Sequence, residues 1–335
     1  MNDAPMRADP STSRVGRIWL DLEPRRGTLF LINIGVPILI GVARGEGRGA
    51  LIGGITGLLL SLADLEGPLA RRLRLTLMVA AGIAVGGLLG IWLKSFEAIF
   101  WIAFILAVFA AGFLNQVGKG PHFSLRFGAI SFAVVAGLPA IETLDYVYWG
   151  LAVMISLASR SADHFINGPL HFAGPWFGAD SFDRWGWVRF SLAYALAATI
   201  GLWIGIESAS IRAVWISAIT LVLMVPDVRV TYSRVFGGMI GTVWLITSLG
   251  QSTVLFCAAI FLAAFLLPSQ ITRFWIFSGM IAVIVLLAWD LASADPGLAS
   301  PSLGTPRGHA PGRDAGAGAY HVTRSLVVAR LRKTK

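Results

Sequence analysis

Long apolar runs separated by short polar loops recur through most of this chain and constrain its fold more than any other feature. A helix that spans the hydrocarbon core of a bilayer needs about 20 mostly apolar residues, with roughly 17 to 25 as the usual range. Eleven runs approach that length, and they cover 27–43, 49–64, 73–93, 96–115, 124–140, 145–159, 187–206, 211–226, 235–250, 252–268 and 274–293. They do not alternate polar with apolar residues, so they predict helices rather than barrel strands.

The composition indicates the same class of protein. Of the 335 residues, 56% are hydrophobic and only 13% are charged, and the mean hydropathy is +0.73. The net charge of +9 does not point to nucleic acid, because the basic residues lie in short loops and a tail, without a basic face or an aromatic RNA-binding motif. We therefore expect an all-α polytopic membrane protein that has the lipid bilayer as its surroundings and no nucleic-acid partner.

The loop charges predict the orientation of the chain. With the N-terminus inside, the inner side carries sixteen Lys and Arg before residue 294, and the outer side carries only four. Cytoplasmic loops are enriched in Lys and Arg, so we expect the polar segment 1–26 in the cytoplasm. This segment lacks the short apolar core and cleavage site of a signal peptide. Cys257 is the only cysteine, which excludes an intrachain disulfide.

Two stretches far apart in the chain are near-copies of each other. RGALIGGITGLLLSLADLEGPLAR at 48–71 and RAVWISAITLVLMVPDVRVTYSR at 212–234 each contain an Arg, an apolar run with Ile-Thr, an Asp, and an Arg seven residues later. Three pairs stand 163 residues apart, and these are Asp64 and Asp227, Arg71 and Arg234, and Arg26 and Arg189. The copies predict a duplicated six-helix module, and an even number of helices gives two parallel repeats.

Twelve helices are expected from this duplication, whereas about 11 are visible. We expect a cytoplasmic segment at 1–26, a first repeat at 27–159, a cytoplasmic interfacial linker at 160–187, a second repeat without its last helix at 188–293, and a disordered tail at 294–335. The tail is too rich in Gly, Pro and charge to span a bilayer. Loss of the twelfth helix by truncation or a frame change is the first interpretation, and a native tail on an eleven-helix protein is the alternative.

Motifs for catalysis are missing from the sequence. There is no phosphate-binding G-x-x-x-x-G-K-[ST] loop, no G-x-S-x-G elbow and no H-E-x-x-H pair. His164 and His171 lie in the aromatic linker without residues that complete a metal-binding set. We therefore expect no catalytic residue, no metal and no cofactor. Glycines four apart, such as Gly82 and Gly86, predict close helix packing.

A few charged residues stand out as functional candidates. Asp64 with Arg71, and Asp227 with Arg234, lie where one predicted helix ends on the cytoplasmic side and the next begins. In one interpretation, each Asp pairs with an Arg, and the pairs exchange partners when the two halves of the protein rock against each other. In the other, the Asp ends a helix and the Arg follows the positive-inside rule. Asp290 lies near the end of the eleventh run, either as an intramembrane functional carboxylate or in the outer headgroup region.

The second half resembles a known family, the fusaric acid resistance or aromatic acid exporter family of bacterial inner-membrane proteins. The residues that carry the resemblance are Arg189 at the start of a helix, WISAIT at 215–220, Pro226-Asp227, Tyr232, Arg234 and GGMIGT at 237–242. The resemblance covers roughly 25–293 and is weaker in the first half. It implies a multi-pass protein of the bacterial inner membrane that exports aromatic carboxylic acids, driven by protons. A periplasmic adaptor protein and further copies of the chain are the candidate partners.

We expect Arg26, Arg71, Arg189 and Arg234 to attract the anionic aromatic substrate, with Trp215 and Thr220 contributing to its binding. Asp290, Asp64 or Asp227 would take up and release protons, because a low-dielectric site raises the pKa of a carboxyl group. A non-transporting membrane scaffold that binds a partner protein is the alternative, and an enzyme acting on lipid-linked substrates is a third possibility.

Overall fold

The computed structural model describes ten ranges of the chain, and all of them belong to one unit that runs to Leu298. These ranges are 23–64, 67–116, 119–137, 142–170, 183–207, 211–225, 230–238 with 240, 253–270 and 273–293. Within them the chain forms α-helices and two short 3-10 turns, and no strand beyond one isolated bridge between Gly67 and Leu170. The expected all-α class is therefore confirmed for the described residues.

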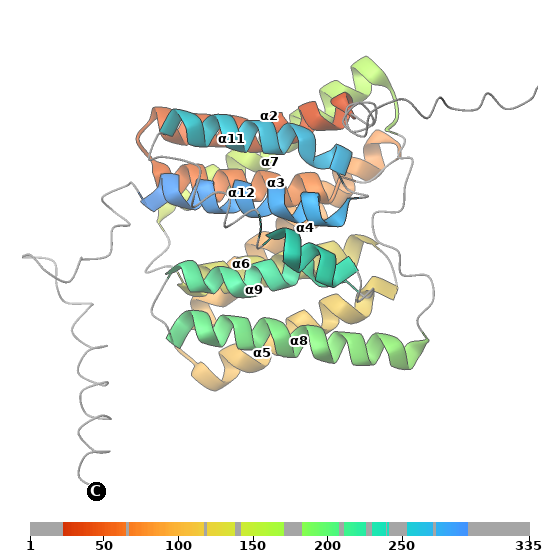
Figure 1. Ribbon diagram of the computed structural model, residues 1–335, viewed down its shortest axis with the longest axis vertical. Coiled ribbons are helices and arrows are strands. Elements are labelled where there is room, and N and C mark those ends of the chain that lie inside the picture. The colour runs from red at the N-terminus through yellow and green to blue at the C-terminus, as the bar shows by residue number, and fades with distance from the viewer. Residues whose placement is uncertain are drawn as a thin grey trace, which may run out of the picture. The chain divides into compact units, whose positions relative to one another are not determined.

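The helices follow the predicted apolar runs closely (Figure 1). They are α2 Pro24–Ala43, α3 Gly47–Leu62, α4 Leu69–Leu93, α5 Glu97–Phe113, α6 Lys119–Gly137, α7 Thr143–Asn167, α8 Arg184–Glu207, α9 Ile211–Leu223, α11 Thr253–Leu266 and α12 Phe274–Ser293. Residues 230–238 are helical as well, and they overlap the start of the ninth predicted run, 235–250.

The predicted linker at 160–187 differs from the structure at both of its ends. α7 continues to Asn167, and α8 already begins at Arg184. The sequence SRSADHFIN is polar and was therefore expected to leave the helix, but its charged side chains have buried partners at the end of α7. His164 belongs to this helical extension, whereas His171 lies outside the described residues.

Three of the described helices are long and apolar enough to cross a membrane. These are α2, α4 and α8, with 20, 25 and 24 residues, judged by length and composition. α3 and α5 are apolar too but shorter. Large apolar side chains also face outward along several helices, among them Trp92, Leu106 and Leu196, which are 68%, 61% and 63% exposed.

Glycines allow α4 and α6 to approach closely. A Cβ atom added at Gly82 or Gly86 of α4 would collide with the backbone of Ser124 or Gly128 on α6. A Cβ at Gly90 would lie 2.8 Å from the carbonyl oxygen of Phe132. Close packing through glycines spaced four apart is thus confirmed for this pair of helices.

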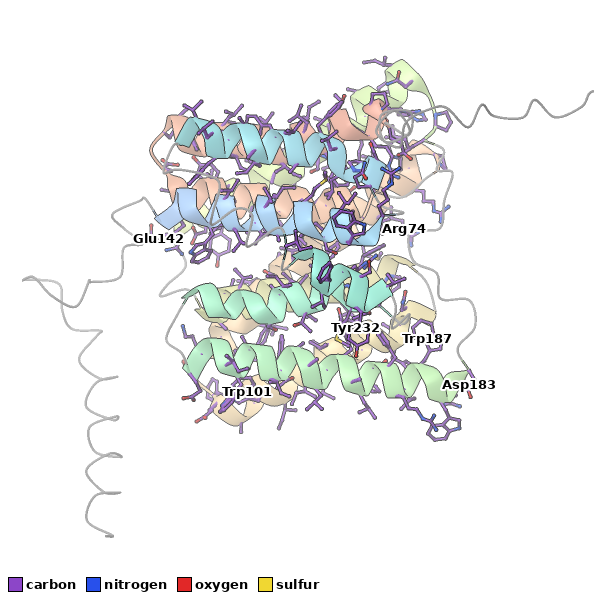
Figure 2. The ribbon with its side chains drawn as sticks, in the orientation of Figure 1. Arg74, Trp101, Glu142, Asp183, Trp187 and Tyr232 are labelled. Atoms are coloured by element: carbon purple, nitrogen blue, oxygen red, sulfur yellow. The ribbon has the colours of Figure 1, made fainter. Side chains whose placement is uncertain are left out.

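The helix ends gather in two groups, and Figure 2 shows labelled residues of both. Arg74, Asp183 and Trp187 lie at one group, and Glu142 lies at the other (Figure 2). We call the first group the Asp64 end, because Asp64 follows α3 there, and the second the Asp145 end, because α7 begins there. The Asp64 end is the one that the loop charges predict to be cytoplasmic.

The largest contacts between the first six helices and the later ones are made by four helix pairs. α5 packs against α8, and α11 packs against α2. In the same way α6 packs against α9, and α12 packs against α3. The first group is α2 to α7, and the later group is α8, α9, the stretch at 230–238, α11 and α12. In this order, the fourth helix of each group packs against the first helix of the other group. Likewise, the fifth helix of each group lies on the second of the other.

Candidate functional site

A buried ion pair between Asp64 and Arg72 forms the centre of the Asp64 end. Asp64 directly follows the C-cap of α3, and Arg72 lies in the first turn of α4. Arg72 donates from Nε to Oδ1 at 2.9 Å and from Nη2 to Oδ2 at 2.7 Å, a two-point contact. The two residues are only 5% and 1% exposed. A planar guanidinium matches a carboxylate in this way, so the pair fixes the turn between α3 and α4.

Further charges extend this pair into a network across four helices. Arg72 also donates to Asp163 of α7 at 2.8 Å, and Arg25 of α2 bonds the same carboxylate at 2.7 and 3.1 Å. Arg160 of α7 is fully buried and lies 3.2 Å from Asp64 Oδ2. We call Arg25, Asp64, Arg72, Arg160 and Asp163 the Asp64 network.

The network also satisfies the end of α3. The last carbonyl groups of a helix have no partner within the helix and carry partial negative charge. Arg160 donates to the carbonyl oxygen of Leu60 at 2.7 Å, and Arg26 donates to that of Asp64 at 3.2 Å. Buried arginines therefore replace the water that would otherwise solvate this helix end.

The environment of Asp64 keeps its carboxylate ionised. Burial alone would raise its pKa, but the positive charges of Arg160, Arg72 and Arg26 outweigh burial and lower the pKa below its usual value. This direction is the opposite of the raised pKa on which a proton-coupling role of Asp64 would depend. The reason is that three guanidinium groups surround the Asp64 carboxylate, whereas the sequence pattern predicted a single arginine partner.

The end of α9 receives hydrogen bonds from an arginine and a tyrosine on neighbouring helices. Arg126 of α6 donates to the carbonyl oxygens of Leu221, Val222 and Met224 at 2.5, 2.8 and 3.1 Å. The hydroxyl of Tyr194, on α8, also donates to Leu221 O at 2.6 Å. α9 thus ends on donors from two neighbouring helices.

A large cavity lies beside this helix end. Its volume is about 1030 Å³, and its walls come from α3, α8, α9, α12, residues 231–238 and Ile130 of α6. Among the described lining residues, the polar ones are Arg189, Thr220, Thr231, Tyr232 and Ser278, and the others are apolar or glycine. Arg189 and Tyr232 are exposed, so they mark the opening of this Asp64-end cavity, and Figure 2 shows Tyr232 at the end of the helices that carries Trp187.

The four predicted substrate-binding arginines lie in four different environments. Arg189 lines the cavity, whereas Arg26 is 3% exposed and contacts the end of α3. Arg71 is exposed, and it is its neighbour Arg72 that pairs with Asp64. Arg234 is 2% exposed, with its guanidinium 5.7 Å from the ring centre of Phe277. The constant spacing of 163 thus does not bring equivalent arginines into equivalent surroundings.

The remaining predicted residues are only partly described. Thr220 lines the cavity. Trp215 lies in α9 and Asp290 in the last turn of α12, and their side chains are outside the described part. Asp227 lies outside the described residues altogether.

Arg126, Arg160 and Asp163 were not predicted as site residues. Arg126 and Arg160 were counted only as positive charges of the cytoplasmic side, and Asp163 was placed in a linker. One available signal was the spacing of Arg160 and Asp163, three apart, which puts both on one face of a helix that continues from the sixth run.

The donor set around these residues suits anions and carbonyl groups rather than metal ions. Among the residues that the structure describes, no group of three or more His, Cys, Asp and Glu gathers closely enough to hold a metal. No family model, curated protein or solved structure matches this chain.

Proposed function

We propose that the chain is a multi-pass membrane protein built from two parallel repeats of a six-helix module, the second of which shows five helices. The reciprocal contacts support this layout, because α5 lies on α8 as α11 lies on α2, and α6 lies on α9 as α12 lies on α3. Two copies related by an axis along the membrane normal would make such an exchange of contacts. The exposed apolar side chains suit surroundings of lipid.

We further propose that it exports aromatic carboxylic acids or similar small anions, as its resemblance to the fusaric acid resistance family implies. The Asp64-end cavity is the observation that carries this proposal. Ligand pockets typically have about 300–1,000 Å³, apolar walls and a few polar groups that fix orientation. The cavity has a volume of about 1030 Å³, and Arg189 is the charged residue among the described residues that line it, which suits an apolar ring with a carboxylate.

In this proposal Arg189 attracts the carboxylate at the opening of the cavity, where Tyr232 also lies, and Thr220 lines the cavity wall. An arginine is always protonated, and its planar group bonds carboxylates at two points. Arg26 contacts the end of α3, so we assign it a structural role rather than substrate binding. Asp64 stays ionised, so we assign proton coupling to Asp290 or Asp227.

Export measurements on Arg189 variants test the proposal. Cells or proteoliposomes with Arg189→Gln should export an aromatic monocarboxylate much more slowly than the wild type at equal amounts of folded protein. Arg184→Gln is the matched control, because Arg184 is an exposed arginine on the same helix that does not line the cavity. Equal export by the wild type and Arg189→Gln would overturn the assignment of Arg189, and no export by the wild type would overturn the function.

The arginines of the repeat give a second comparison. Arg234→Ala and Arg71→Ala were both expected to lower export. Because Arg71 is exposed away from the cavity walls and Arg234 lies between wall residues 232 and 235, we now expect a loss only for Arg234→Ala. If neither variant changes export at normal protein levels, neither arginine belongs to the substrate path.

A further inference from the structure

A second cavity lies in the half of the bundle near the Asp145 end. Its volume is about 330 Å³, and it is lined by α3, α4, α6 and α7. Arg48 and Asp145 lie among its walls and form an ion pair at 2.5 Å. No residue of the later helices, from α8 onward, is among the described residues that line it.

The two cavities meet at the middle of the bundle. Ile55, Leu59 and Ile130 line both of them, and these three residues are 9%, 4% and 2% exposed. A side chain that lines two cavities stands between them. Two residues of α3 and one of α6 therefore form an apolar partition, which we call the Ile130 partition.

The helices of the partition have partners in both groups of helices. α3 packs against α2 and α7 as well as α12, and α6 packs against α4 and α5 as well as α9. A movement of the two groups against each other therefore shifts α3 relative to α12 and α6 relative to α9. Such rocking is the usual way in which repeat-built transporters expose a site to alternate sides.

We propose that the two cavities are the two halves of one substrate path and that the Ile130 partition is its closed gate. The occupant is the aromatic monocarboxylate of the proposed function, on which this inference rests. The path offers this anion Arg189 at one opening and apolar walls along its length, and the Arg48–Asp145 ion pair lies at the other end. Apolar constrictions close such paths by excluding water.

Accessibility of single thiols tests the gate without any substrate. Cys257 is the only cysteine, so Cys257→Ser provides a cysteine-free background. In that background Ala197→Cys reports on the Asp64-end cavity and Ser131→Cys on the other one. A membrane-impermeant maleimide applied to each face of oriented vesicles should label the first thiol only from the Asp64 face and the second only from the Asp145 face.

Opening the partition should change this sidedness. With Leu59→Ala or Ile130→Ala, the thiol of the Ala197→Cys variant should also become labelled from the Asp145 face. Leu60→Ala is the control, because Leu60 is a fully buried neighbour on α3 that lines neither cavity. Size-exclusion chromatography in detergent verifies that each variant is folded, and labelling from the Asp64 face shows that the thiol is reactive.

Two results would overturn the inference. One is that the thiol of the Ala197→Cys variant remains unlabelled from the Asp145 face in the presence of Leu59→Ala, of Ile130→Ala and of both substitutions together. The other is equal opening by Leu60→Ala, since that would mean general loosening of the bundle. A gate that opens as expected in a protein that exports no aromatic acid would leave the path standing and refute only the proposed function.

Discussion

The ends of α3 and α9 carry the two copies of the repeated stretch, yet they are built differently. α3 ends in the Asp64 network, in which two carboxylates and three arginines tie four helices together. At the end of α9, Arg126 and Tyr194 donate to backbone carbonyl groups, and a cavity of about 1030 Å³ lies beside them.

The difference separates a fixed end from an adaptable one. Buried ion pairs resist movement, because separating the partners leaves an uncompensated charge in an apolar surrounding. Hydrogen bonds from one arginine to several carbonyls can shift from one acceptor to the next without such a cost. In the proposed function, the α3 end is therefore the fixed frame and the α9 end is the part that would bind substrate.

Removing Arg72 should have the largest effect. Arg72→Ala leaves Asp64 buried with only Arg160 and Arg26 nearby, and breaking a buried pair costs about 3–5 kcal/mol of folding free energy. We expect the variant to yield little folded protein by size-exclusion chromatography in detergent. Arg71→Ala is the matched control and should behave as the wild type. Equal losses for both variants would show that the turn, not the ion pair, is what matters.

Loss of Arg126 should be smaller, since its acceptors among the described residues are the carbonyl groups at the end of α9. Arg126→Ala removes charge-assisted hydrogen bonds, each worth roughly 1.5–3 kcal/mol when buried, but water in the adjacent cavity can solvate the freed carbonyls. We expect a lowered melting temperature with folded protein retained. Arg126→Lys should recover only part of the loss, because an ammonium cannot span three oxygens. A melting temperature lower than that of Arg72→Ala would reverse the comparison.

Tyr194→Phe probes the same helix end more gently. It removes one hydrogen bond to Leu221 O, which Arg126 still satisfies, so the cost should be about 0.5–1.5 kcal/mol. Thermal melts of the wild type, Tyr194→Phe and Arg126→Ala should fall in that order of decreasing stability. An effect of Tyr194→Phe as large as that of Arg126→Ala would make the tyrosine, not the arginine, the main donor.

The smallest change expected is in pH dependence. A carboxyl group whose pKa is lowered by folding adds stability above its unfolded pKa, about 3.9, and loses that contribution as the pH falls through its lower folded pKa. The difference in melting temperature between the wild type and Asp64→Asn should therefore be constant from about pH 5 to pH 8 and shrink only below about pH 4. A difference that changes within that window would return Asp64 to the proton-coupling candidates.

The sequence predicted the helices well, because apolar length and loop composition decide where helices lie in such a chain. Charged residues were harder. Arg71 was chosen over Arg72 from repeat spacing, but the face that each residue takes depends on where α4 begins after Pro68. Asp163 was not predicted as a site residue because the apolar run ends at residue 159, whereas α7 continues to Asn167. The cavity could not be predicted, since it depends on side chains from helices that are distant in the chain.

Filling the Asp64-end cavity tests the central claim most directly. Ala193→Trp puts a large ring on its wall, and Leu196→Trp puts the same ring on the outer face of α8, which does not line the cavity. At equal amounts of folded protein, our account predicts that Ala193→Trp stops the export of an aromatic monocarboxylate and that Leu196→Trp leaves export unchanged. Export by Ala193→Trp at the rate of the wild type would contradict it.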